Sequence, residues 1–153
     1  MTSRLEIRLA IESDLPAIVE LLADDPLGAC RERPGLPIAP QYSSAFKEMQ
    51  RQEGNHLLIA IIGDELVGCL QLTLIAGISR LGAKRGQIEG VRVSSARRGQ
   101  GIGEKLVRYA IERARAEGCS LLQLTTDRSR PDPLRFYERL GFVASHIGMK
   151  LKL

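Results

Sequence analysis

The stretch Arg97-Arg98-Gly99-Gln100-Gly101-Ile102-Gly103 is the segment from which the fold can be read. It follows an apolar run typical of a strand, residues 88–93, and precedes a strongly amphipathic helical pattern, residues 102–117. The first N–H groups of a helix have no partner within the helix, and the helix dipole places partial positive charge there. Glycines let the backbone come close to an anion, and arginines add charged donors. This strand–loop–helix unit therefore predicts a binding site for a phosphorylated ligand.

Two common phosphate-binding patterns do not fit this loop. A Walker loop ends in Gly-Lys-Ser/Thr, whereas an acidic residue follows Gly103. The dinucleotide pattern G-x-G-x-x-G can begin at Gly99 and Gly101, but it meets Glu104 where its third glycine belongs. The pattern that remains is Arg-x-x-Gly-x-Gly, which begins at Arg98.

This pattern resembles the pyrophosphate-binding motif of the GNAT superfamily, the coenzyme A-dependent N-acetyltransferases. Two further segments are similar to those of the family and lie in the same order. Residues 87–93 (Gln-Ile-Glu-Gly-Val-Arg-Val) resemble its central strand, and residues 135–142 (Arg-Phe-Tyr-Glu-Arg-Leu-Gly-Phe) resemble its helix near the C-terminus. The resemblance extends from about residue 55 to residue 153, and residues 1–20 are compatible with it.

The resemblance implies that acetyl-coenzyme A (acetyl-CoA) is the co-substrate and that an amine attacks its thioester directly. It also implies that backbone groups of the loop hold the pyrophosphate, and that backbone groups of two strand residues pair with the pantetheine arm. The cofactor-binding residues are Val91, Val93, Arg98, Gly99, Gln100, Gly101, Ile102 and Gly103. Many members carry an asparagine in the loop after the fifth strand, but residues 126–132 contain none. Either Ser129 or Arg130 replaces that contact, or the contact is absent.

Glu89 interrupts an apolar strand face. Strict alternation places its side chain with those of Val91 and Val93, where burial disfavours the charged form and should raise the pKa of the carboxyl group. Such a group suits a general base that takes a proton from an amine, directly or through water. The alternative is an end or edge position where Glu89 reaches solvent, and Gly90 could mark a bulge that breaks the alternation. The resemblance favours the catalytic role, because an acidic residue of this strand is held to be the base in many members.

Tyr137 lies in a short helical pattern with Phe136 and Leu140. One interpretation is that its ring packs in the core. The other is catalytic, because a tyrosine hydroxyl stays protonated at neutral pH and can give its proton to a thiolate leaving group. The resemblance assigns Tyr137 this second role, so the predicted catalytic pair is Glu89 and Tyr137.

Composition and charge narrow the class of protein. With 153 residues, 44% apolar and 26% charged, the chain suits one globular domain, predicted as an N-acetyltransferase domain over residues 1–153. It has no 18-residue apolar run and no signal-peptide core, so we expect a cytoplasmic protein without a membrane partner. Ten Lys/Arg stand against three Glu between residues 80 and 115, which suits a small polyanionic ligand. Nucleic acid is the competing partner, but six aromatic residues and no Trp leave little stacking surface, so we expect none.

The cysteines and histidines point to no further chemistry. Cys30, Cys69 and Cys119 are far apart and form no CxxC pair, so we predict three buried free thiols. His56 and His146 are also far apart, and we expect neither a metal site nor a histidine-based triad. Cys119 remains an alternative nucleophile, although no histidine lies near it in the sequence.

Periodicity and turn residues predict an α/β protein of the α+β GNAT type: a mixed, largely antiparallel central sheet with helices on both faces. The expected strands are residues 5–9, 56–62, 66–75, 87–93, 120–125 and 143–153, and the expected helices are residues 13–23, 42–52, 102–117 and 133–140. Loops 24–40 and 76–86, with the helix that begins near Tyr42, should form the acceptor pocket.

The sequence does not identify the acceptor, and small amines, amino acids, aminophosphonates, polyamines and a protein terminus all remain open. We expect a small-molecule amine. The competing function is a non-catalytic module that senses acyl-CoA. A homodimer is also expected, since family members often pair through C-terminal strands and residues 143–153 form a long apolar edge candidate.

Overall fold

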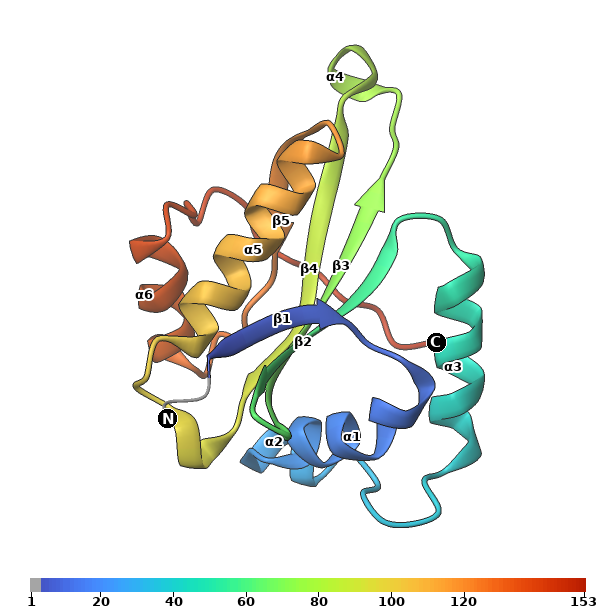
Figure 1. The fold of residues 1–153 in the computed structure, drawn as a ribbon. Helices are drawn as coiled ribbons and strands as arrows, with labels where there is room; N and C mark the ends of the chain where they lie inside the picture. The colour runs from blue at the N-terminus through green and yellow to red at the C-terminus, as the bar shows by residue number, and fades with distance from the viewer. Residues whose placement is uncertain (1–3) are drawn as a thin grey trace.

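The structure, a computed structural model, describes residues 4–153 apart from the side chain of Pro131, so the first three residues of the predicted domain lie outside it. Its centre is one five-stranded sheet in the order β1-β2-β3-β4-β5 (Figure 1). Neighbouring strands are antiparallel except for the parallel pair β4 and β5. This confirms the predicted mixed, largely antiparallel sheet. The strands are β1 (Leu5–Leu9), β2 (Asn55–Ile62), β3 (Glu65–Ile75), β4 (Lys84–Val93) and β5 (Cys119–Leu124).

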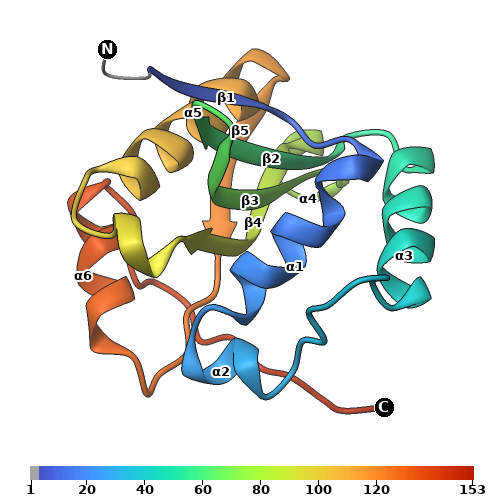
Figure 2. The same cartoon turned by 60° about the horizontal axis from the view of Figure 1, so that its bottom comes forward.

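Helices cover both faces of the sheet, as predicted (Figure 2). The α-helices are α1 (Leu15–Ala23), α2 (Pro26–Ala29), α3 (Pro40–Arg51), α4 (Ser79–Gly82), α5 (Ile102–Ala116) and α6 (Pro131–Arg139), and short 3-10 turns span Glu12–Asp14 and Ser95–Arg97. None of the helices within residues 4–153 has the length and apolar content needed to cross a membrane.

Two apolar clusters hold these layers together. Beneath α5, Leu106 and Val107 are fully buried against Leu58, Leu70 and Leu72 of the sheet. On the opposite face, residues of α1 and Phe46 of α3 pack against Ile59 and Cys69. The sheet is therefore buried from both sides, which fixes the position of β4 and of the loop that follows it.

The predicted final strand, residues 143–153, does not form. This segment, here called the C-terminal arm, leaves the sheet instead: Val143, Ile147, Met149 and Leu151 are 81–92% exposed. It passes the end of β5, where a Cβ on Gly148 would lie 3.1 Å from Cγ2 of Thr125. In Figures 1 and 2 it then runs across to the side of the molecule on which α3 lies. The alternation predicted that these apolar side chains would be buried in the sheet, but they are not. Among residues 4–153, β5 therefore remains an edge strand.

The prediction of three buried thiols is correct only in part. Cys69 is buried, Cys119 is half-buried and Cys30 is exposed. Cys30 directly follows α2 at the surface, within the predicted loop 24–40.

Candidate functional site

The glycine loop lies between β4 and α5, as predicted. Gly99 and Gly101 have φ angles of +77° and +74°, a left-handed conformation that favours glycine. Gly101 is the N-cap of α5, and within residues 4–153 no side chain caps this helix. The first N–H groups of α5, together with the helix dipole, are therefore available to an anion.

Gly103 lies where the first turn of α5 meets the end of β4 and α6. A Cβ at this position would lie 3.4 Å from Cγ2 of Val93 and 3.5 Å from Cζ of Phe136, which is ordinary van der Waals contact. This close approach brings the glycine loop and the helix that carries Tyr137 to the same end of the sheet.

The parallel pairing with β5 stops halfway along β4, and the unpaired region beyond this point is here called the opening between β4 and β5. Pairing runs from Lys84 opposite Cys119 to Ile88 opposite Leu124 and then stops. Beyond that point, residues 89–93 pair with β3, and no strand of residues 4–153 lies on their other side. This free edge can accept hydrogen bonds from, and donate them to, an extended ligand.

A β-bulge interrupts β4 beside Glu89. Two residues of β4, Gly90 and Val91, lie opposite the single residue Leu70 of β3. Gly90 takes φ +60°, which a residue with a side chain rarely adopts. The bulge adds one residue and so reverses the alternation of the side chains that follow it.

This bulge corrects the prediction for Glu89. Val91 and Val93 pack against the core beneath α5, as does Ile88 before the bulge. Glu89 points to the other face and is exposed. The prediction that Glu89 shares a face with Val91 and Val93 is wrong, and burial therefore no longer supports its role as a base. Its exposure beside the opening leaves the carboxylate accessible to a ligand.

Tyr137 is half-buried between Phe136 and Phe142, with ring centroids 5.0 and 5.7 Å away in edge-to-face geometry. Burial raises the pKa of its hydroxyl, and the nearby cations Arg92 and Arg130 oppose that effect. The hydroxyl is therefore protonated at neutral pH, as a proton donor requires. The aromatic contacts also serve packing, so both predicted roles of Tyr137 stand.

A buried carboxylate that sequence analysis missed lies beside these residues. Oδ1 of Asp25 accepts a hydrogen bond of 2.6 Å from the N–H of Gly28 and so caps α2. Oδ2 lies 3.0 Å from Nε of Arg92 and 3.8 Å from Nη1 of Arg130. Burial opposes ionisation, but the Gly28 bond and the two arginines hold the pKa of Asp25 below its usual value. The Asp-Pro pair at residues 25–26 was a visible N-cap signal; its ion pairs were not visible in the sequence.

Asp24 fastens the same segment to the glycine loop. Its carboxylate accepts hydrogen bonds from the backbone N–H and the hydroxyl of Ser95, at 2.7 and 3.0 Å, which lower its pKa. Its carbonyl oxygen accepts a bond of 3.0 Å from Nη2 of Arg98. A cavity of about 200 Å³ lies here, lined by Asp25, Pro26, Leu27, Arg98, Ser129 and Arg130.

Loop 24–40 therefore reaches the site through its first residues, and its role in an acceptor pocket stays a prediction. The prediction for loop 76–86 is wrong at its tip, because Figure 1 shows α4 at the end of the sheet opposite the glycine loop. A second cavity, of about 390 Å³, lies between α3 and the start of β2. It is lined in part by the helix predicted for the acceptor pocket, but by none of the predicted catalytic or cofactor-binding residues. Among the described residues, no three His, Cys, Asp or Glu side chains gather in a way that would hold a metal ion. Burial raises the pKa of Cys119, which disfavours the thiolate that a nucleophile requires.

The profile of the acetyltransferase (GNAT) family matches residues 15–142. The chain belongs to the GNAT family. This confirms, at the level of the family, the predicted fold and the predicted activity of an acetyl-CoA-dependent N-acetyltransferase.

Two curated relatives and one solved structure are similar to this GNAT chain. A glucosamine 6-phosphate N-acetyltransferase of Trypanosoma brucei brucei is 32% identical over 97% of this chain and 96% of its own length. An aminoalkylphosphonate N-acetyltransferase of Salmonella typhimurium is 35% identical over 60% of this chain and 58% of its own length. The crystal structure of a transcriptional regulator from Bacillus halodurans C-125 is 52% identical, with a TM-score of 0.95 over 98% of this chain and 100% of its own.

Proposed function

We propose that this chain moves the acetyl group of acetyl-CoA to a primary amine of a small-molecule acceptor, in the opening between β4 and β5. The observation that carries the proposal is the coincidence of three features at one end of the sheet. These are an uncapped helix N-terminus after a glycine loop, a free β4 edge over residues 89–93, and a protonated Tyr137 hydroxyl.

Cofactor binding follows from the first two features. The backbone N–H groups from Arg98 to Gly103 would hold the pyrophosphate of acetyl-CoA, since a helix N-terminus favours phosphate. Backbone groups of Val91 and Val93 would pair with the amides of pantetheine, as an added strand pairs with a sheet edge. The side chains of both valines face the core beneath α5, so this role needs only their backbone.

The chemistry requires one proton acceptor and one proton donor. As the amine nitrogen forms its bond to the acetyl carbon, Glu89 takes the proton that the nitrogen loses, directly or through water. As the bond between carbon and sulfur breaks, Tyr137 gives its proton to the leaving sulfur. No covalent enzyme intermediate is needed.

The two curated relatives support a small amine as the acceptor. Glucosamine 6-phosphate and aminoalkylphosphonates are both small molecules with a primary amine. Amino acids, polyamines and peptide N-termini belong in the same acceptor panel as competing classes.

A second candidate function is a module that binds acyl-CoA without turning it over. The observation in its favour is that the 52% identical neighbour is described as a transcriptional regulator. Both functions use the glycine loop, and they differ at Glu89 and Tyr137.

We also propose a homodimer in which the C-terminal arm covers apolar surface of a second copy. The support is physical: an alternating apolar segment, exposed along its length, and an open β5 edge occur in the same chain.

The test of the enzymatic proposal is thiol release from acetyl-CoA over a panel of amines. We expect amine-dependent release, which Glu89→Gln and Tyr137→Phe strongly reduce while acetyl-CoA binding is retained. Saturable binding of acetyl-CoA without release for any amine would favour the sensor instead.

A further inference from the structure

We infer that Arg92 and Arg130, bridged by Asp25, bind an anionic group of the acceptor: the phosphonate or phosphate monoester of a primary amine. The inference deepens the proposed function and rests on it. It assigns a role to three residues outside the predicted site, all in segments that converge on the opening between β4 and β5.

The charges at this position do not balance. The side chain of Asp25 is only 4% exposed, and its Oδ2 has no hydrogen bond within residues 4–153 although two guanidinium groups approach it. One carboxylate cannot neutralise two arginines, so these three side chains by themselves keep a net positive charge. The carboxylate of Asp127 also acts on Arg130, but it is exposed to solvent. Asp25 therefore holds two cations together without satisfying them.

Both arginines also keep hydrogen-bond donors to spare. Arg92 donates from Nη1 to the carbonyl oxygen of Val91 at 2.9 Å, and its Nε faces Asp25. Nη1 of Arg130 lies 3.8 Å from Oδ2 of Asp25, which is beyond hydrogen-bond distance. A guanidinium has five N–H donors in a planar fork that matches a phosphate or phosphonate, so two bridged forks form a suitable site for one dianion.

The position of this pair indicates the acceptor rather than the cofactor. Arg92 follows Glu89 across the bulge and lies on the same face of β4, opposite the core beneath α5. Both cations lie close enough to Tyr137 to act on its hydroxyl. An anion held by them would sit at the reacting end of the opening. The pyrophosphate has its own donors at the start of α5, and the cavity that Asp25 and Arg130 line meets this cofactor site at Arg98.

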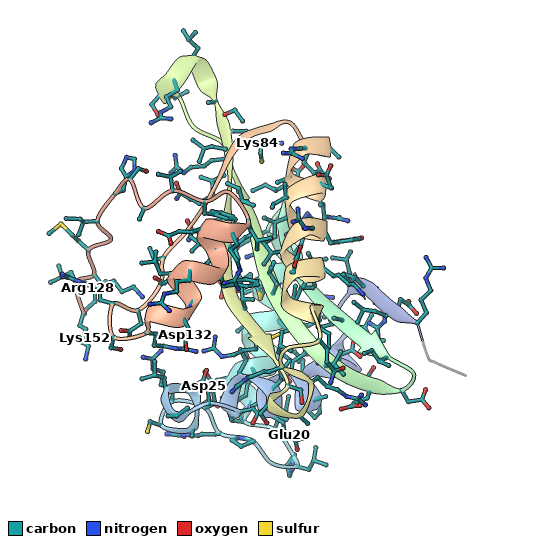
Figure 3. The ribbon with its side chains drawn as sticks, turned by 90° about the vertical axis from the view of Figure 1, so that its left-hand side faces the viewer. Glu20, Asp25, Lys84, Arg128, Asp132 and Lys152 are labelled. Carbon is teal, nitrogen blue, oxygen red and sulfur yellow. The ribbon has the colours of Figure 1, made fainter. Side chains whose placement is uncertain are left out.

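In the view of Figure 3, Asp25 is drawn below α6. Arg128, on the same loop as Arg130, lies to the side of α6. Arg128 is exposed, so Arg128→Gln removes the same charge from the same loop and is the matched control for Arg130→Gln. Arg130 is 41% exposed at its side chain, so its replacement should leave the fold intact.

The competing explanation is structural: the ion pairs merely fasten loop 24–40 over the opening. The two explanations differ in which acceptors they affect. A fastening role changes the rate with every acceptor alike, whereas an anion site changes it only for acceptors that carry the anion.

The experiment compares matched acceptors in the thiol-release assay: glucosamine 6-phosphate against glucosamine, and 2-aminoethylphosphonate against ethanolamine. We expect the wild type to prefer the phosphorus-bearing member of at least one pair by about 10- to 100-fold in kcat/KM, the range of a charged hydrogen bond. Arg130→Gln should abolish that preference, leave the neutral acceptor within about threefold, and leave the KM for acetyl-CoA unchanged. Arg128→Gln should behave as the wild type.

Three results would overturn the site. One is equal use of both members of each pair by the wild type. Another is an equal loss of kcat/KM with both members of a pair in Arg130→Gln, which would show that the ion pairs only fasten the loop. The last is a KM for acetyl-CoA that rises in Arg130→Gln with every acceptor, which would assign the pair to the cofactor.

A binding measurement separates this inference from the proposed function. 2-Aminoethylphosphonate, but not ethanolamine, should raise the melting temperature of the wild type and fail to do so in Arg130→Gln. That result without any turnover would keep the anion site and remove the acetyl transfer. If the protein acetylates neutral amines, shows no preference for the phosphonate and gains no melting temperature from it, the acetyl transfer is kept and the anion site is removed.

Discussion

Helix α5 and the C-terminal arm both show a regular apolar period in the sequence, yet the apolar side chains of α5 are buried and those of the arm are exposed. In α5, the residues at helical spacing, Ile102, Leu106 and Val107 among them, are at most 3% exposed. In the arm, the alternating residues Met149 and Leu151 remain 92% and 86% exposed. A period shows that side chains need cover; it does not show which surface provides it.

The difference arises from what lies within reach of each segment. Helix α5 follows β4 directly, and its apolar stripe returns onto the sheet that β4 belongs to. The arm follows α6 and passes the end of β5 without pairing with it. We therefore expect substitutions in and beside α5 to act on the single chain, and substitutions in the arm to act on association.

The largest expected effect is catalytic and belongs to the folded body. Tyr137→Phe keeps the ring contacts with Phe136 and Phe142 and removes only the hydroxyl. If Tyr137 is the proton donor, kcat should fall by about 10²- to 10⁴-fold while acetyl-CoA affinity is retained. The measurement is steady-state thiol release with chemistry rate-limiting, and wild-type kcat in this variant would remove Tyr137 from the mechanism.

The next effect contrasts the two regions in stability. Leu106→Ala empties a fully buried site in α5 and should lower the free energy of unfolding by about 2–5 kcal/mol. Leu151→Ala, the same change in the arm, should stay within about 0.5 kcal/mol at a protein concentration where single chains dominate. Urea unfolding at low concentration checks both values; equal losses would mean that the arm is packed on its own chain.

A smaller effect tests what covers the arm. Light scattering at tens of micromolar should show a homodimer for the wild type and a monomer for Leu151→Asp, because the aspartate places a charge on the apolar face. Lys152→Asp introduces the same charge on the neighbouring, alternate position and should remain dimeric. A monomeric wild type at this concentration would contradict the proposed homodimer.

The smallest expected effect concerns a charge fixed in the body. Arg8 donates to Asp14 at 2.7 and 3.0 Å, and this interaction holds the pKa of Asp14 below its usual value. A depressed carboxyl pKa stabilises the fold above the unfolded value of about 3.9 and ceases to do so as pH falls through the depressed value. Asp14→Asn should therefore cost about 0.5–1 kcal/mol at pH 7 and nothing at the acid end, as measured by urea unfolding.

Much of the fold was predictable because local signals agreed with the packing. The hairpin of β2 and β3 and the helix between residues 102 and 116 lie within one or two residues of their predicted bounds. Glu89 was placed on the wrong face because a single bulge at Gly90 reverses the alternation that follows it, and the sequence marked that bulge only by a glycine.

The site was predictable where backbone chemistry carries it and not where side chains meet over long distances. The glycine loop can be recognised from composition, because the positive φ angles of this loop favour glycine and no side chain caps the helix that follows it within the described residues. The bridge from Asp25 to Arg92 and Arg130 joins residues 67 and 105 positions apart, and no local period encodes such a pairing. The prediction of a final strand over residues 143–153 was wrong because the alternation shows only that these side chains need an apolar surface. It does not show that this surface belongs to the sheet of the same chain.

The central claim is that the start of α5 binds the pyrophosphate of acetyl-CoA, and two glycines of this one helix allow a direct test. Gly101 at its N-terminus and Gly118 just beyond its C-terminus have φ angles of +74° and +81°, and a Cβ on either meets nothing within 4 Å. Gly101→Val and Gly118→Val therefore impose the same backbone strain, but only the first places a side chain at the uncapped N–H groups. Titration with acetyl-CoA should raise the melting temperature of the wild type and of Gly118→Val, and leave that of Gly101→Val nearly unchanged. An equal shift in both variants would contradict the assignment of the cofactor to this loop.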